Sequence, residues 1–202
     1  MTFVEFLRGE VMIKGERIEL VSATLDDRQK AYEWCFHAET TKSHSGPPDY
    51  PENPILSYAE FCDKGYEDYY FTGEKPKDGG GFFIAIEGKP IGFISYSCFH
   101  LKPGMAELDN WIKSEKNCGK GFGTDAIIAL GNYLHESLGI HTLIMGPSIK
   151  NARAIRAYEK AGLIRTDQRM CDFLRPEYLS VYGNGDYGIE QTAVCVKRFD
   201  WQ

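Results

Sequence analysis

The chain has 202 residues, 43% of them hydrophobic, and a formal net charge of −6. This length supports the buried core of one domain and is short for two, so we expect a single domain over residues 1–202. No stretch approaches the roughly 18 consecutive apolar residues of a membrane helix, and an acidic chain without a basic run argues against a nucleic-acid partner. The N-terminal residues lack the basic start, apolar stretch and cleavage site of a secretion signal, so we expect a soluble, cytoplasmic protein.

The N-terminal part of the chain is predicted to form one strand and two helices. Alternating residues predict a strand over Arg17–Ala23. The segment Thr24–His37 begins with an N-cap residue and carries acids in its first turn, which is typical of a helix start. A loop with four prolines is predicted at Thr40–Pro54 and a second helix over Ile55–Phe71.

Strand signals dominate the middle of the chain. Two apolar runs rich in β-branched and aromatic residues flank the turn "EGKP" and predict a hairpin over Gly81–His100. A further strand is predicted over Met105–Ile112. After a glycine-rich loop, apolar residues at helical spacing predict a helix over Asp125–Leu138 that stops at Gly139.

The last third of the chain alternates strand and helix before it closes with strands. We predict a strand over His141–Gly146, a helix over Asn151–Gly162 with Asn151 as its N-cap, and two strands over Leu163–Cys171 and Ile189–Phe199. A strand–helix–strand crossover inside an otherwise hairpin-built sheet indicates an α/β (α+β) layout with a mixed sheet.

The cysteine and histidine patterns do not indicate a metal site. The cysteines show neither a CxxC pair nor zinc-like spacing with histidine, so we expect free thiols and no metal cofactor. The six cysteines are Cys35, Cys62, Cys98, Cys118, Cys171 and Cys195. The histidines also lack ligand spacing, and we expect structural roles for them. They are His37, His44, His100, His135 and His141.

The segment Asn117–Thr124, "NCGKGFGT", places Gly119, Gly121 and Gly123 directly before the predicted helix. It lacks the spacing of a Walker P-loop, and it is one residue short of the dinucleotide fingerprint GxGxxG. Successive amides before a helix start can instead form a nest that binds phosphate or diphosphate. The alternative is a flexible turn with a glycine cap, and the loop alone leaves both interpretations open.

The residues on both sides of this loop resemble the GNAT superfamily of acetyl-CoA-dependent N-acetyltransferases. In the family's loop motif, Gly121 and Gly123 fill the glycine positions, and Cys118 stands where Gln or Arg is usual. A second motif follows one strand later, and its matching residues are Asn151, Ala154, Ile155, Arg156, Tyr158, Glu159, Lys160 and Gly162. The resemblance implies a mixed, mainly antiparallel central sheet of about six to seven strands flanked by about four helices.

Within that superfamily, the chain looks most similar to the aminoglycoside N-acetyltransferases that act on the 6′-amine. Their strand before the loop carries Asp-Gln, and here Asp109 is followed by Asn110. Their later segment carries an acid before a proline, and here Gly146 precedes Pro147. That acid is expected to help bind the cationic drug. Its replacement by Gly146 therefore bears on which amine the chain accepts, and it leaves the acetyl transfer itself intact.

Acetyl-CoA is the cosubstrate that the resemblance implies. Its diphosphate is expected on the amides of Cys118 through Thr124, and its pantetheine arm along the end of the Met105–Ile112 strand. An N–H of Ile112 or its neighbour would face the thioester oxygen. The charge of Lys120 would either support the diphosphate or only be solvated. The residues expected to bind the coenzyme are Trp111, Ile112, Cys118, Gly119, Lys120, Gly121, Phe122, Gly123, Thr124, Asn151, Ala154 and Arg156.

Acetyl transfer to an amine also needs a base and an acid, because an alkyl ammonium has a pKa near ~10 and the thiolate must leave protonated. Glu107 and Asp109 lie two apart on a strand and share a face with Trp111. The resemblance assigns the base to Asp109, with Glu107 as the second choice, and the acid to Tyr158. The alternatives are solvated or lysine-paired acids, and a tyrosine that only packs in the core.

We expect a small cationic amine as the acceptor, with an aminoglycoside or similar amino-sugar favoured. Its pocket is predicted between the Thr40–Pro54 loop, the "YEDYY" segment and residues Asp172–Glu190. The acids of these segments are Asp49, Glu67, Asp68, Asp172, Glu177, Asp186 and Glu190. A protein N-terminal amine or a polyamine competes within the same chemistry, and a non-catalytic acyl-CoA-binding module is the alternative of another class. We expect no membrane partner, and either a monomer or a homodimer.

Overall fold

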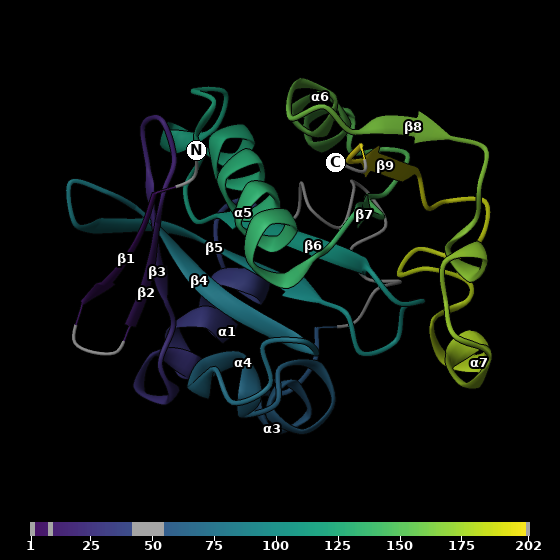
Figure 1. Cartoon of the computed structure of the whole chain (residues 1–202), viewed down its shortest axis with the longest axis horizontal. Helices are drawn as coiled ribbons and strands as arrows, with labels where there is room; N and C mark the ends of the chain where they lie inside the picture. Colours follow the sequence, from purple (N-terminus) through teal and green to yellow (C-terminus); the bar gives the residue numbers. More distant parts are fainter. Residues whose placement is uncertain (1–2, 8–9, 42–54, 201–202) are drawn as a thin grey trace.

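The computed structural model describes residues 3–7, 10–41 and 55–200 (Figure 1). The loop predicted at Thr40–Pro54 therefore lies outside the described residues, except for its first two positions. His44 and Asp49 lie outside them as well. All six cysteines are described and are free thiols, as predicted.

One sheet of nine strands runs through the described part of the chain, in the order β1-β2-β3-β4-β5-β6-β7-β9-β8. Neighbouring strands are antiparallel except for β6 and β7, which are parallel, so the predicted mixed and mainly antiparallel sheet is confirmed. The strands are β1 (Phe3–Leu7), β2 (Glu10–Lys14), β3 (Glu19–Ser22), β4 (Gly79–Ile86), β5 (Lys89–Ser97), β6 (Met105–Ile112), β7 (Thr142–Met145), β8 (Ile164–Thr166) and β9 (Val194–Arg198). The number of strands exceeds the prediction, partly because the sequence interpretation did not include β1 and β2.

Helices cover both faces of this sheet. Helix α5 lies on one face, near α6, whereas α1, α3 and α4 lie on the other (Figure 1). The α-helices of the described residues are α1 (Arg28–Phe36), α3 (Tyr58–Glu60), α4 (Tyr69–Thr72), α5 (Phe122–Leu138), α6 (Ala152–Lys160) and α7 (Leu179–Tyr182). None of the described helices is both long and apolar enough to cross a membrane.

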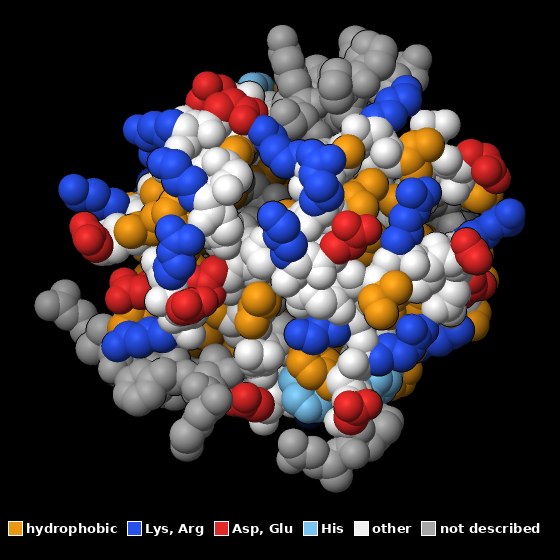
Figure 2. Space-filling view, turned by 90° about the horizontal axis from the view of Figure 1, so that it is seen from above, with side chains coloured by type: hydrophobic (Ala, Val, Ile, Leu, Met, Phe, Trp, Pro, Cys, Tyr) orange, Lys and Arg blue, Asp and Glu red, His pale blue; other side chains and the backbone are white. Residues whose placement is uncertain are grey.

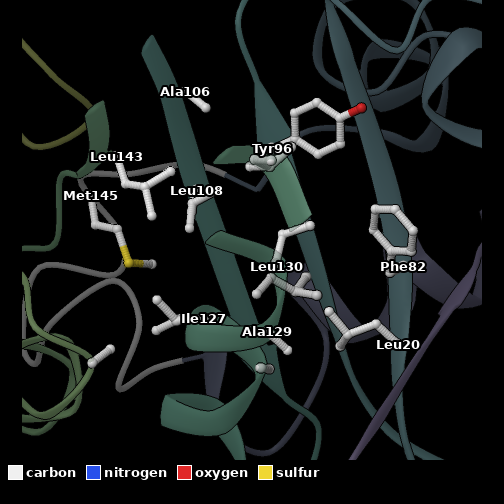
Figure 3. Close-up of a cluster of buried hydrophobic side chains, with 14 of the residues drawn as sticks. Leu20, Phe82, Tyr96, Ala106, Leu108, Ile127, Ala129, Leu130, Leu143 and Met145 are labelled. Atoms are coloured by element: carbon white, nitrogen blue, oxygen red, sulfur yellow. The ribbon is translucent and has the colours of Figure 1, made fainter. Parts of the chain in front are cut away.

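Helix α5 forms the centre of the main core. Its residues Ile127, Leu130 and Leu134 recur at helical spacing, and all three are buried in one cluster. Figure 3 shows Ile127 and Leu130 beside strand residues such as Leu108 and Leu143. Burying a side chain of this size contributes roughly 1.5–3 kcal/mol each. This packing sets the axis of α5 against the sheet and so positions the glycine loop at its N-terminus.

The helix predicted over Ile55–Phe71 is wrong as a continuous element. The chain forms the short α3, a π-helical turn at Phe61–Gly65, and then α4. The buried guanidinium of Arg28 accounts for the break, because it donates hydrogen bonds to the carbonyls of Cys62 and Tyr66 and pairs with Asp68. The carbonyls that bind Arg28 lie where a straight helix would continue.

Both of the last strands are shorter than predicted. The strand β8 ends at Thr166, and the chain then turns through a 3-10 helix at Met170–Asp172. Met170, Phe173 and Leu174 pack with Val194 in a separate buried cluster beneath this segment. These apolar side chains are buried in a cluster, and their segment does not continue the strand. The residues that follow, Asp172–Glu190, form short helices and turns.

Candidate active site

A gap opens in the sheet between β6 and β7. The two strands pair only from Met105 to Glu107 on the β6 side, whereas β6 runs on to Ile112. From Leu108 onward, β5 still pairs with one edge of β6, and no described strand pairs with the other. A cleft of about 390 Å³ lies here, between the end of β6, the glycine loop and α6. We call it the β6–α6 cleft.

The glycine loop lines this cleft with main chain. Gly119 and Gly121 have φ of 73° and 85°, which L-residues with side chains rarely adopt. Gly121 is also the N-cap of α5 and provides no side-chain acceptor for the first-turn amides, which have no partners within the helix. A Cβ on Gly123 would lie 3.0 Å from Nδ2 of Asn110, which donates to the Gly123 carbonyl at 3.0 Å. Each glycine therefore has a local structural reason.

Residues outside the predicted motif hold the loop in place. Arg17 donates from Nη1 to the carbonyl of Lys120 at 2.7 Å, and its guanidinium lies 4.8 Å from the centre of the Phe122 ring. The carboxylate of Asp125 accepts from the amides of Glu16 at 2.9 Å and Arg17 at 2.7 Å. The sequence interpretation missed both anchors, because they join positions more than a hundred residues apart.

Most of the predicted coenzyme-binding residues line the β6–α6 cleft. Lys120 is the exception, because its side chain is exposed and outside the cleft wall. The predicted residues in the wall are Trp111, Ile112, Cys118, Gly119, Gly121, Phe122, Gly123, Thr124, Asn151, Ala154 and Arg156, together with Tyr158. The wall also contains residues that were not predicted to bind: Thr40, Asn110, Asn117, Arg153, Ala157 and Lys160. Their contact roles stay predictions.

Helix α6 presents its N-terminal turn and one tyrosine to the cleft. The side chain of Asn151 accepts from the amide of Ala154 at 3.0 Å, which confirms Asn151 as the N-cap. Tyr158 lies on the same helix and is only 6% exposed. Thr124 donates from Oγ1 to the carbonyl of Ala157 at 3.2 Å and joins α6 to the start of α5. These contacts fix the width of the cleft.

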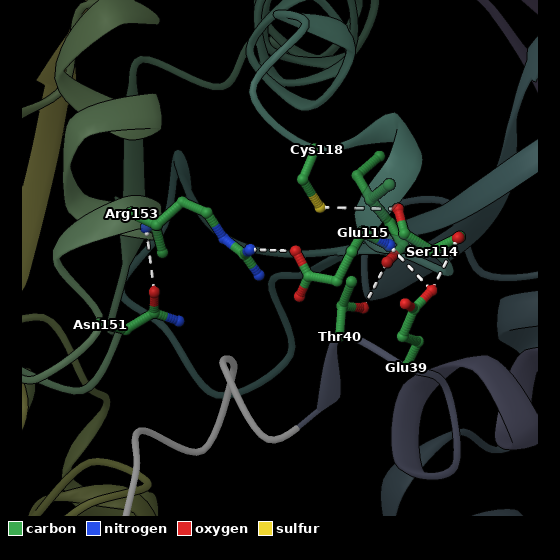
Figure 4. Close-up of polar contacts among 9 residues, drawn as sticks. Glu39, Thr40, Ser114, Glu115, Cys118, Asn151 and Arg153 are labelled. Carbon is green, nitrogen blue, oxygen red and sulfur yellow. Dashed lines mark hydrogen bonds and ion pairs between the residues drawn. The ribbon is translucent and has the colours of Figure 1, made fainter.

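The cleft wall is cationic, although the whole chain is acidic. It contains Arg153, Arg156 and Lys160 and no Asp or Glu among the described residues. Of these three cations, only Arg153 forms an ion pair with another described residue: its Nη1 lies 2.5 Å from Oε2 of Glu115 (Figure 4). The face seen in Figure 2 likewise carries many Lys and Arg side chains among its acids. An anion is the favoured occupant.

An orphan polar atom also lies beside the cleft. Oδ1 of Asn110 is buried and has no hydrogen-bond partner among the described residues. A buried acceptor without a donor costs free energy, so it favours a ligand that brings an N–H group. The free edge of β6 and this acceptor together fit an extended, amide-containing chain.

Three carboxyls interact electrostatically near the β6–α6 cleft: Glu107, Asp109 and Asp186, here called the acid cluster. Burial first, and then the charges of Asp186 and Glu107, raise the pKa of Asp109 well above its usual range. The surrounding protein, followed by the charge of Glu107, raises the pKa of Asp186 to about 6, although the residue also contacts solvent. Such a cluster attracts cations.

His100 holds one member of the acid cluster in place. Its Nε2 lies 2.8 Å from Oε2 of Glu107, and the ring is 4% exposed. The described residues form no Lys or Arg ion pair with Glu107 or Asp109, so the lysine-paired alternative does not apply to them. Oε1 of Glu107 lies 3.7 Å from the position that a Cβ on Gly146 would take. The carboxylate of Glu107 is therefore next to the position where the similar 6′-acetyltransferases carry an acid and this chain has Gly146.

Tyrosines connect the acid cluster to the cleft. Burial first, and then the charge of Asp109, raise the pKa values of both Tyr158 and Tyr66. The hydroxyl of Tyr66 lies 2.7 Å from Oγ of Ser95, which faces Asp109 across the β5–β6 pair. Tyr158 thus belongs to both regions, because it lines the cleft and lies in the field of Asp109. The described residues contain no His, Cys, Asp and Glu group arranged to hold a metal ion.

Comparison with known proteins shows the family. Residues 17–164 match the model of the acetyltransferase (GNAT) domain, and the chain belongs to this family. An aminoglycoside N(6′)-acetyltransferase type 1 of Klebsiella pneumoniae is 32% identical over 94 residues, which are 42% of this chain and 47% of that protein. A kanamycin resistance protein of Rhizobium radiobacter is 38% identical over 63 residues, 31% of this chain and 58% of that protein. The matches therefore span about half the length of these relatives.

Solved structures agree with the fold. AAC(6′)-Ib in complex with ribostamycin and coenzyme A superposes with a TM-score of 0.64 at 20% sequence identity, covering 91% of this chain and 94% of that one. This likeness confirms the predicted GNAT-like fold of the chain.

Proposed function

We propose that this chain transfers the acetyl group of acetyl-CoA to a primary amine of a small polycationic acceptor, with residues 1–202 acting as one domain. The observation that carries the proposal is the position of Tyr158, which lines the β6–α6 cleft and lies in the field of Asp109. A proton donor in the cleft wall is thus paired with a carboxylate that acts on it electrostatically. Amine acetylation needs both groups at one point.

The β6–α6 cleft suits acetyl-CoA, which supplies the acyl thioester. The first-turn amides of α5 and the positive-φ glycines offer donors to its diphosphate. The orphan Oδ1 of Asn110 and the free edge of β6 offer partners to the amides of its pantetheine arm. The three cations of the wall, Arg153, Arg156 and Lys160, supply the matching charge.

Asp109 is proposed as the base and as the anchor of the cationic amine. Its raised pKa makes the carboxylate a better proton acceptor at neutral pH than an ordinary aspartate. An ammonium bound beside Asp186 and Glu107 would have its charge balanced before it is deprotonated. Glu107 itself is fastened to His100, so it suits a binding role better than proton transfer.

Tyr158 is proposed as the acid that protonates the departing thiolate. Its raised pKa keeps the phenol protonated at neutral pH, so the proton is present when the sulfur leaves. Burial of the ring also fixes its direction, because Tyr158 packs in the main core. Packing and catalysis are therefore compatible at this residue.

The acid cluster favours an acceptor with more than one ammonium group. Three carboxyls within mutual electrostatic reach are costly without cations, and a polyamine or an amino-sugar would relieve that cost. The relatives that match in sequence are named for aminoglycosides and kanamycin. We therefore favour an aminoglycoside-like amino-sugar over a protein N-terminus, which offers a single ammonium.

Thiol release from acetyl-CoA tests this proposal. The panel contains kanamycin, spermidine and a short peptide with a free N-terminus, each with wild-type protein and with Asp109→Asn. We expect turnover with kanamycin that the substitution abolishes. Turnover with only spermidine or only the peptide would support an acetyltransferase that acts on a different acceptor. Coenzyme binding without turnover on any amine would favour a non-catalytic acyl-CoA-binding module instead.

A further inference from the structure

One ion pair crosses the mouth of the β6–α6 cleft. Glu115 belongs to the short 3-10 helix after β6, and Arg153 to the first turn of α6, so their 2.5 Å contact joins the two walls (Figure 4). Glu39 fixes the Glu115 side of the bridge, because its carboxylate accepts from Oγ of Ser114 at 2.7 Å and from the amide of Glu115 at 3.1 Å. The side chain of Glu115 is thereby aimed across the opening.

This ion pair brings a carboxylate to the edge of an otherwise cationic cleft. Arg153 is one of the three cations in the wall, and its partner is a carboxylate from just outside the wall. Both side chains are 41% exposed, so a dissolved anion can reach the guanidinium. Exposed ion pairs are weak, whereas a doubly charged phosphate offers a guanidinium a stronger, bidentate partner.

We propose that Glu115 and Arg153 form an exchangeable latch, in which a phosphate group of the bound coenzyme replaces Glu115 as the partner of Arg153. The inference rests on the proposed use of acetyl-CoA. In the empty protein Glu115 competes with the phosphate for Arg153. When the phosphate binds, the carboxylate turns to solvent, and no covalent bond changes. Arg153 is thus a coenzyme-recognition residue, and Glu115 sets the strength of its recognition.

Calorimetric titration with coenzyme A tests the latch directly. Glu115→Gln removes the competitor, so we expect about twofold to fivefold tighter binding, the range that a half-exposed ion pair supports. Arg153→Gln should weaken binding about tenfold. The double variant should bind like Arg153→Gln alone, because the gain from the first change requires the guanidinium. Glu159→Gln removes a negative charge from α6, the helix that carries Arg153; it is the matched control and should leave affinity unchanged.

The results separate this inference from the proposed function. Wild-type protein that fails to bind coenzyme A overturns both. The latch alone is overturned if the wild type binds coenzyme A and Glu115→Gln, shown to be folded by its melting temperature, binds it equally or more weakly. The ion pair would then persist in the complex and serve a structural role. A gain that survives in the double variant also overturns the latch.

Dephospho-coenzyme A, which lacks the 3′-phosphate, shows which phosphate binds Arg153. The tighter binding of Glu115→Gln disappears with this ligand if the 3′-phosphate is the partner and persists if the diphosphate is. Either result supports exchange.

Discussion

The β6–α6 cleft and the acid cluster differ in composition, although Tyr158 belongs to both. The cleft is built from main-chain amides and three cations, and all but one of its lining residues come from one stretch of chain between Asn110 and Lys160. The acid cluster combines two residues of β6 with Asp186 from a late loop, and His100 supports it. One region attracts anions and the other attracts cations.

On the proposed function, this difference in charge would let one small domain bind two substrates of opposite charge. The acid cluster would repel an anionic coenzyme and the cleft would repel a cationic acceptor, so each would enter its own region. We expect the two substrates to meet near Tyr158 and Asp109. Substitutions in the acid cluster should therefore change turnover, and substitutions in the glycine loop should change coenzyme affinity.

The largest effect is expected for Asp109→Asn. Loss of the base should lower kcat roughly 10²–10⁴-fold, while coenzyme affinity stays within about twofold because Asp109 does not line the cleft. Steady-state kinetics with saturating acceptor and calorimetry with coenzyme A measure the two quantities. Glu107→Gln serves as the comparison, since we expect it to raise the KM of the acceptor more than it lowers kcat. A larger fall of kcat in Glu107→Gln would make Glu107 the base.

A fall of about 10²-fold in kcat is expected for Tyr158→Phe, because the leaving thiolate loses its proton donor. The ring and its packing are retained, so the melting temperature and coenzyme affinity should change little. Kinetics of thiol release and thermal melting measure these effects. An equal loss of kcat and affinity would show that Tyr158 acts through packing.

A fall of about tenfold in coenzyme affinity is expected for Gly119→Ala. A residue with a Cβ at this positive φ costs ~1–2 kcal/mol, and the loop relaxes by turning its amides away from the phosphate. Gly88→Ala is the matched control, because Gly88 has φ of 72° and open space around its Cβ position, as Gly119 does. The control should lose similar stability and no affinity. Equal losses of affinity would refute the loop's proposed role.

A pH profile tests the electrostatic coupling within the acid cluster. Burial, followed by the charge of Asp186, holds the pKa of Asp109 high, so Asp186→Asn should lower it. Since the base must be deprotonated, the acidic limb of kcat/KM should move to lower pH in this variant. Glu177→Gln, an exposed change in the same late segment, should leave the limb in place. A limb that does not move in Asp186→Asn would show that Asp109 is not the titrating base.

The smallest effect concerns folding stability. The folded pKa of Asp186 is raised to about 6 from an ordinary 3.8, so the folded state binds this proton more tightly than the unfolded state. Its contribution to stability is therefore present at low pH and is lost as the pH rises through about 6. Asp186→Asn should gain melting temperature over wild type at pH 7.5 and gain less at pH 4.5. The opposite order would contradict the raised pKa.

The sequence predicted the cleft better than the acid cluster, for a physical reason. The loop glycines, Asn151 and Tyr158 stand at fixed spacings near a helix start, where local geometry decides the structure. The anchor Arg17 and the neighbour Asp186 act across long sequence distances, which spacing does not reveal. Asp186 was predicted only as one acid of a pocket wall. The π-helical break after α3 was missed because it depends on the buried Arg28.

Kinetics of Asp109→Asn and Gly119→Ala, measured side by side in one thiol-release assay with varied acetyl-CoA and saturating kanamycin, test the central claim most directly. We expect the first variant to lose kcat with an unchanged KM for acetyl-CoA, and the second to raise that KM with kcat nearly retained. If both variants lost kcat and raised KM together, the cleft and the acid cluster would not have separate tasks, and the account would be wrong.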